Sequence, residues 1–129
     1  MRTLQPPGER GQDVVEFALI IPVLFLILMG IFDMGRATFS YTVLLNAARE
    51  GARFGVIHPT DSAGIEAKVR DMAVGLDPST LTVTTTSPDS NTIRVSLNYQ
   101  FTVVTPGIQV FFGSNQVAMV GQSTMWLEH

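Results

Sequence analysis

The sequence predicts an α+β fold: one long N-terminal helix, a second amphipathic helix and a three-stranded antiparallel sheet. Three patterns lead to this class. An apolar run occupies positions 14–32, helical spacing then continues to about position 58, and apolar residues alternate with polar ones in the C-terminal third. Helices followed by a group of strands indicate a small α+β head built on a helical stalk.

The composition of the 129 residues fits one domain, with an appendage at most. Eight basic and eleven acidic residues give a net charge of −3, and the charges form no block of like sign. A nucleic-acid partner is not expected, because such proteins usually carry a basic stripe. The chain has no cysteine, which excludes disulfides and thiol chemistry.

The apolar run has three interpretations. Residues 14–32 would rise roughly 28 Å as a helix, close to the hydrocarbon thickness of a bilayer, although the uncharged part, residues 17–32, would rise only about 24 Å. A secretory signal peptide needs a shorter apolar core and a small-residue cleavage site, and no clear site follows here. A buried core helix is the second alternative. Because residues 20–29 are apolar on every side, a single transmembrane helix, predicted over residues 12–33, is favoured.

The helical pattern continues beyond the apolar run. One face repeats at spacings of three or four: Met34, Thr38, Tyr41, Leu45, Ala48, Ala52 and Val56. Ala47, Gly51 and Gly55 form a ladder of small residues that allows close approach of another backbone. Each glycine would cost about 1 kcal/mol relative to alanine in an exposed helix, so packing is expected on it, either by another subunit or by the protein's own head. The helix should end near His58, because Pro59 disfavours helical geometry before it.

The remaining residues predict the rest of the head, which together with the helix extension should span 34–129. Residues 61–76 predict an amphipathic helix with Asp61 or Ser62 as its cap and Gly75 near its end. Its expected apolar face consists of Ile65, Val69, Met72, Ala73 and Leu76. Roughly seventy residues after Pro59 cannot bury much alone, so the outer half of the long helix should complete the core.

Period-two patterns predict three strands. The first contains Leu81, Val83 and Thr85, and the clearest alternation runs over residues 93–103. A third strand closes the chain, and Gly121 in it suggests a β-bulge. The apolar connection at residues 105–115 fits either a short helix or a tucked loop.

Catalytic and metal-ligating motifs are absent from the sequence. His58 has no cysteine, second histidine or spaced carboxylate beside it, and the neighbouring Asp61 is explained by helix capping. No nucleophile elbow, phosphate-binding loop or zinc-protease motif is present. We therefore expect no enzymatic activity, no cofactor and no metal site.

The N-terminal segment resembles the processing motif of type IV pilins. Gly11 is followed by a polar residue, and Glu16 and Phe17 occupy the fifth and sixth positions after it. Together with the long helix, two stretches resemble the TadE-like pseudopilins of tight-adherence (Tad) systems: "RGQDVVEFALIIPVLFLILMGIFDMGR" and "NAAREGARFGVIHP". The resemblance covers Arg10–Pro59, with a weaker echo in the terminal "STMWLE".

The resemblance implies how the protein is processed and placed. A leader, residues 1–11, would stay in the cytoplasm, and prepilin peptidase would cut between Gly11 and Gln12. The arginines flanking the apolar run do not decide its orientation, but the family places the N-terminus inside and the head outside the inner membrane, or on a surface pilus. Expected partners are other pilin or pseudopilin subunits, prepilin peptidase, membrane lipid and the Tad assembly platform, in pilus biogenesis and cell adhesion.

The resemblance also gives Glu16 a role. A carboxylate near a membrane boundary is costly unless it is paired. In pilins the equivalent glutamate is thought to meet the N-terminal amine of a neighbouring subunit, and cleavage here would create that amine on Gln12. The alternative is that Glu16 reaches out to the lipid headgroups from near the helix start. Two other functions stay open at this point: a stand-alone anchored binding module that does not polymerise, and an envelope enzyme.

Overall fold

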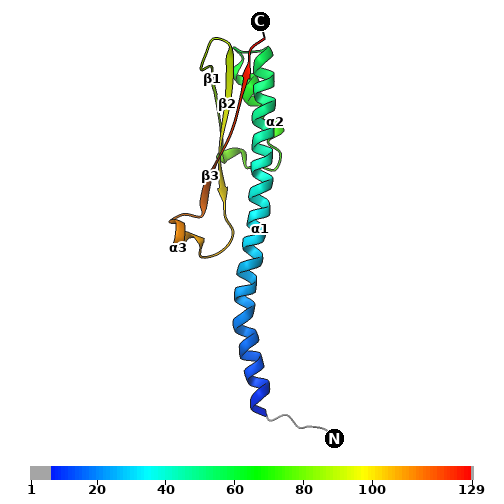
Figure 1. The fold of residues 1–129 in the computed structure, drawn as a ribbon, viewed down its shortest axis with the longest axis vertical. Helices are drawn as coiled ribbons and strands as arrows, with labels where there is room; N and C mark the ends of the chain where they lie inside the picture. The colour runs from blue at the N-terminus through cyan, green and yellow to red at the C-terminus, as the bar shows by residue number, and fades with distance from the viewer. Residues whose placement is uncertain (1–6, 129) are drawn as a thin grey trace.

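A computed structural model describes residues 7–128. One helix runs the length of the molecule, and a small head packs along its C-terminal half (Figure 1). The elements are, in order, α1 (Pro7–Ile57), α2 (Ser62–Met72), a 3-10 turn η1 (Pro78–Thr80), β1 (Leu81–Thr86), β2 (Thr92–Thr102), α3 (Ile108–Phe112) and β3 (Gln116–Trp126). The predicted α+β class and its elements are confirmed.

The three strands form an antiparallel meander in the order β1-β2-β3. The pairing of β2 with β3 is unbroken from Thr92 opposite Trp126 to Thr102 opposite Gln116, so the bulge suggested at Gly121 is wrong. Glycine is needed there for a different reason. A Cβ at position 121 would lie 2.9 Å from Cγ of Leu44 and 3.2 Å from its backbone carbonyl, so its absence lets β3 lie directly on α1.

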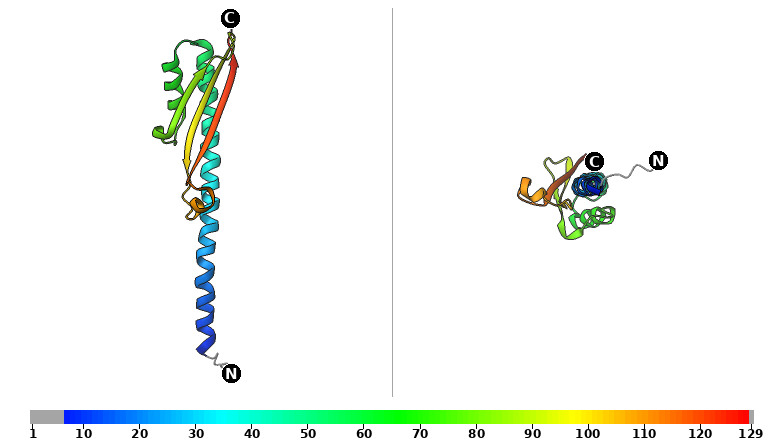
Figure 2. Two further views of the ribbon diagram at one scale, coloured as in Figure 1. Left: turned by 90° about the vertical axis from the view of Figure 1, so that its left-hand side faces the viewer. Right: turned by 90° about the horizontal axis from the view of Figure 1, so that it is seen from below.

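The core lies between the sheet and the two longer helices, which share one face of the sheet (Figure 2). The strand β2 supplies alternate buried residues, which are Ile93, Val95, Leu97, Tyr99 and Phe101. The helices supply Leu44, Ala47, Ala48 and Ala52 from α1 and Ile65 and Val69 from α2. The C-terminal half of α1 is therefore part of the head's core, as the small size of the head predicts.

The helix boundaries follow local chemistry. The helix α1 ends at Ile57, one residue before His58, as expected. The carboxylate of Asp61 caps α2 by accepting a hydrogen bond from the Gly64 amide at 2.8 Å. The helix α2 stops at Met72, four residues earlier than predicted, and Met72 is 37% exposed rather than part of the apolar face.

The connection between β2 and β3 contains the short helix α3. Gly107 and Gly113 flank it, and both adopt left-handed backbone geometry, with φ of 86° and 71°. Of the two alternatives for this segment, the short helix is correct. It is not tucked against the core, since none of its residues is buried.

Candidate functional site

The N-terminal half of α1, residues 12–33, extends beyond the head (Figure 1). It is mostly apolar and is here called the apolar rod. Thirteen large apolar side chains between positions 14 and 32 are 45–69% exposed. This helix is long and apolar enough to cross a membrane, judged by its length and composition. A helix that is apolar on every side needs lipid or other apolar chains as its cover, because contact of so much apolar surface with water is unfavourable.

The residues of the predicted processing motif lie on this rod, within continuous helix. The side-chain amide of Gln12 donates a long hydrogen bond, 3.4 Å, to the Glu16 carboxylate one turn later. The Phe17 side chain is exposed. Among the described side chains, residues 11–128, no cation pairs with Glu16. A Cβ on Gly11 would have no neighbour within 4 Å, so packing within the chain does not require glycine there. Residues 1–6 of the predicted leader lie outside the described residues.

The ladder of small residues faces the protein's own head. Ala47 is fully buried. A Cβ on Gly51 would collide with the Val69 side chain, and one on Gly55 would collide with that of Ile93. The sheet and α2 therefore occupy this part of α1 within a single chain, and close packing accounts for both glycines.

Asp33 lies where the two halves of α1 meet. It was not identified as a site residue from the sequence. Its side chain lies at the end of the apolar rod and is held by the loop after β2, with only 6% of the residue exposed. Thr105 donates to it from its hydroxyl at 2.6 Å and from its amide at 2.7 Å, and the Val104 amide donates at 3.0 Å. Arg36 adds an ion pair at 3.0 Å. The sequence did contain a signal for Asp33: a carboxylate at the end of an apolar run needs a partner at the membrane boundary.

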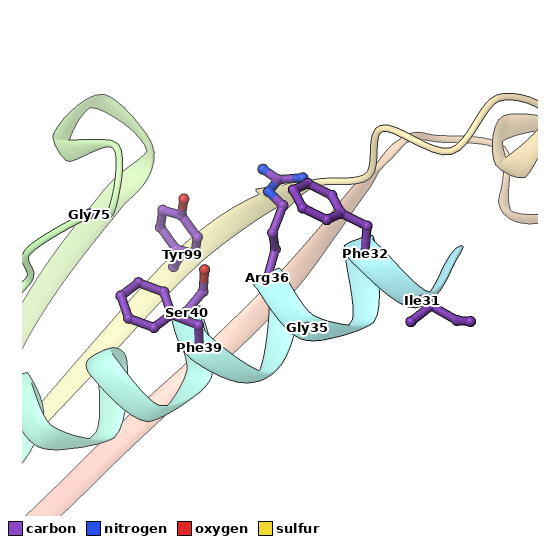
Figure 3. A pocket seen from close by; sticks show the side chains of 8 residues that line it. All are labelled: Ile31, Phe32, Gly35, Arg36, Phe39, Ser40, Gly75 and Tyr99. Atoms are coloured by element: carbon purple, nitrogen blue, oxygen red, sulfur yellow. The ribbon is translucent and has the colours of Figure 1, made fainter. Parts of the chain in front are cut away.

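Two open grooves flank this junction. The larger, of about 500 Å³, lies between α1 and the sheet, and Figure 3 shows its lining residues: Ile31, Phe32, Gly35, Arg36, Phe39, Ser40, Gly75 and Tyr99. The guanidinium of Arg36 lies 5.1 Å from the centre of the Phe101 ring, which places the cation over an aromatic face. The second groove, of about 270 Å³, lies where Gly30 and Asp33 approach Ile108 of α3. Both grooves offer apolar surface at the base of the head.

Comparison with known proteins finds a similarity that covers the rod and the first two residues of the ladder. Residues 11–53 match the family model described as TadE-like protein. Over these residues the chain is similar to TadE-like proteins. No curated protein and no solved structure matches the chain. The matched residues are about a third of the 129 and fall entirely within α1.

The TadE-like segment begins at the predicted cleavage position, Gly11, and ends between Gly51 and Gly55 of the ladder. It includes Glu16 and Asp33 but none of α2 or the sheet. The resemblance to TadE-like proteins is thereby confirmed. Similarity to this family over residues 11–53, combined with a long apolar helix, fits a pilin-like protein.

Proposed function

We propose that this protein is a non-enzymatic, pilin-like subunit of a Tad pilus system, anchored in the inner membrane by the N-terminal half of α1. The observation that carries the proposal is the exposed apolar rod inside the TadE-like segment. A surface of this size and polarity is suited to lipid before assembly and to the helices of neighbouring subunits afterwards. The head would lie outside the membrane, available to other pilus components and to surfaces in adhesion.

Processing would prepare the rod for assembly. Prepilin peptidase would cut between Gly11 and Gln12, where the glycine has no packing role within the chain. The product would start at Gln12, with a new amine four residues before Glu16. The existing bond from the Gln12 side chain shows that the two residues lie on the same face of the helix.

Glu16 would then serve as the assembly residue. Its carboxylate has no cation partner among the described side chains, which leaves it available for the Gln12 amine of a neighbouring subunit. Attraction between opposite charges is many times stronger in a low-dielectric environment than in water. Phe17, exposed beside Glu16, would contribute apolar contact at the same place.

The test compares pilus assembly in the Glu16→Ala variant with assembly in Asp13→Ala, which is the matched control. Asp13 is also acidic and exposed and lies one turn earlier on the rod. Loss of Glu16 would leave the neighbour's amine without a partner in a buried contact, at about 3–5 kcal/mol, or roughly a thousandfold in the assembly equilibrium. Pilus number and co-purification with other pilins should fall strongly in Glu16→Ala, fall less in Glu16→Asp, and be nearly unchanged in Asp13→Ala.

Membrane level and leader cleavage are measured in the same cells. Both should be normal in Glu16→Ala, because removing a charge does not impede membrane insertion. Normal piliation in Glu16→Ala, with normal cleavage, would contradict the assembly role and favour the interpretation that Glu16 contacts headgroups. If the protein without substitutions is cleaved but enters no pilin complex, the result would instead support an anchored module that does not polymerise.

A further inference from the structure

The helix α3 presents three consecutive large apolar side chains to the outside. Val110, Phe111 and Phe112, here called the apolar tip, are 79–85% exposed, more than any other large hydrophobic side chain that the structure describes. The left-handed glycines Gly107 and Gly113 turn the chain on either side of the tip. The Gly113 amide closes the turn by donating to the Gln109 carbonyl at 2.8 Å. The tip is therefore a compact projection with a defined backbone.

The tip is held beside the end of the apolar rod. Figure 1 shows α3 at the end of the head that is closest to the N-terminal half of α1, set off to one side of that helix. The bonds from Val104 and Thr105 to Asp33 fix the chain just before α3. Ile108, the first residue of α3, lines one groove together with Gly30 of α1. These contacts place the tip level with the last turns of the uncharged run.

Apart from Asp33 and its partner Arg36 at the junction itself, charge is missing from both surfaces that meet here. The rod has no charged residue from position 17 to position 32, and the chain has none from position 95 to position 127. The loop, α3 and all of β3 fall within the second range. Entry of α3 into the headgroup region would therefore desolvate no ionised side chain, which is the usual obstacle to such contact.

We infer that the apolar tip is a second membrane contact, which inserts into the interface of the same bilayer that α1 crosses. Helices that lie in the membrane interface bury faces rich in Trp, Phe or Leu about 5–10 Å deep, at the boundary between headgroups and acyl chains. The tip lies level with the end of the apolar rod, so the lipid that covers the rod before assembly is also the expected occupant of the tip. The tip and the Asp33 junction would together fix how far the head stands above the membrane. This inference rests on the membrane anchoring proposed above.

The experiment uses single cysteines in the full chain, which has none of its own. The variants Gln109→Cys, Leu24→Cys and Ser87→Cys are each labelled with an environment-sensitive fluorophore and reconstituted into phosphatidylcholine and phosphatidylglycerol vesicles that carry nitroxide-labelled lipid. Gln109 lies in α3, Leu24 in the rod, and Ser87 in the turn between β1 and β2 at the far end of the head. All three are exposed.

The lipid nitroxide should quench the label at position 24 strongly and the label at position 109 several-fold more than the label at position 87. The double variant Phe111→Ser, Phe112→Ser should lose most of the quenching at position 109. Val120→Ser is the matched control, since Val120 is also an exposed apolar residue but lies on β3 away from the tip, and it should leave the quenching at position 109 unchanged.

The outcomes separate the two proposals. If the label at position 24 is not quenched, the membrane anchor itself is wrong. If position 24 is quenched and position 109 behaves like position 87, the anchor stands and the inserted tip is overturned. A blue-shifted label at position 109 without lipid quenching would mean that a second protein chain covers the tip, which also overturns the inference.

Discussion

The two halves of α1 share one regular backbone but differ in what covers their side chains. The N-terminal half, residues 12–33, consists mostly of large apolar residues that no part of the chain covers. The C-terminal half contributes small residues, Ala47, Ala48, Gly51 and Ala52, which are fully buried or nearly so under the sheet and α2. Large side chains suit contact with lipid or neighbouring helices, whereas small ones let a sheet approach the helix axis.

The difference shows how one helix can serve two environments. In the C-terminal half the chain supplies its own cover, so that part behaves as the core of a small domain. The N-terminal half is left for partners outside the chain. Asp33 marks the change from one half to the other, because it is the first residue of α1 that the head buries.

Removing α1 tests this division and has the largest expected effect. A fragment beginning at Pro59 lacks Leu44, Ala48 and Ala52 and would expose the buried face of β2, so we expect no cooperative unfolding. A fragment beginning at Gly30 should unfold cooperatively. Urea unfolding followed by circular dichroism compares the two. Equal stability of the fragments would show that the head folds without α1 and that the two halves of the helix do not differ as described.

Two glycine exchanges in α1, one at a position buried under the head and one at an exposed position, sharpen the comparison. Gly51→Leu would force side-chain atoms against Val69 and Val95 and should lower the free energy of unfolding of the Gly30 fragment by about 1–3 kcal/mol. Gly35→Leu is the matched control, since a Cβ there has no neighbour within 4 Å and little loss is expected. Similar losses in both variants would contradict the assignment of Gly51 to packing on the head.

The junction between the halves is tested by Asp33→Asn in the full chain in detergent micelles. An amide side chain cannot accept all the hydrogen bonds that the carboxylate receives, so we expect a loss of about 1–3 kcal/mol. Hydrogen exchange at the amides of Val104 and Thr105 should accelerate. Asp71→Asn, at an exposed position on α2, should leave that exchange unchanged. Unaltered protection of both amides in Asp33→Asn would mean that another contact holds the loop.

The smallest effect is expected from Arg36→Ala. The arginine side chain is 40% exposed, and an ion pair with that much solvent contributes about 0–1 kcal/mol. Asp33 would keep its donors from Val104 and Thr105. The same unfolding and exchange measurements apply. A loss equal to that of Asp33→Asn would show that charge, rather than the loop, holds the carboxylate.

Much of the fold was predictable because burial repeats at the period of each element. The alternation from Ile93 to Phe101 predicted the central strand, and the carboxylate at Asp61 predicted the start of α2. Gly121 was misinterpreted because its reason is the approach of Leu44, a contact between distant parts of the chain. The same limit applies to Asp33, because its donors Val104 and Thr105 lie more than seventy residues away in the sequence.

The candidate site was predictable in part. A local motif predicted four of its residues, because the spacing within such a motif can be recognised without the tertiary structure: Gly11, Gln12, Glu16 and Phe17. The ladder that contains Gly51 was recognised, but the sequence could not say whether a subunit or the head covers it. The exposure of the apolar tip could not be predicted from the sequence either, because it depends on how the sheet packs on α1.

The N-terminal residue of the protein isolated from its native membrane is the most direct test of pilin-like processing. N-terminal sequencing should give Gln12, because removal of residues 1–11 leaves 118 of the 129 residues. That result would place the new amine where Glu16 of a neighbouring subunit can meet it. An intact Met1, in cells with an active prepilin peptidase, would contradict the proposed function.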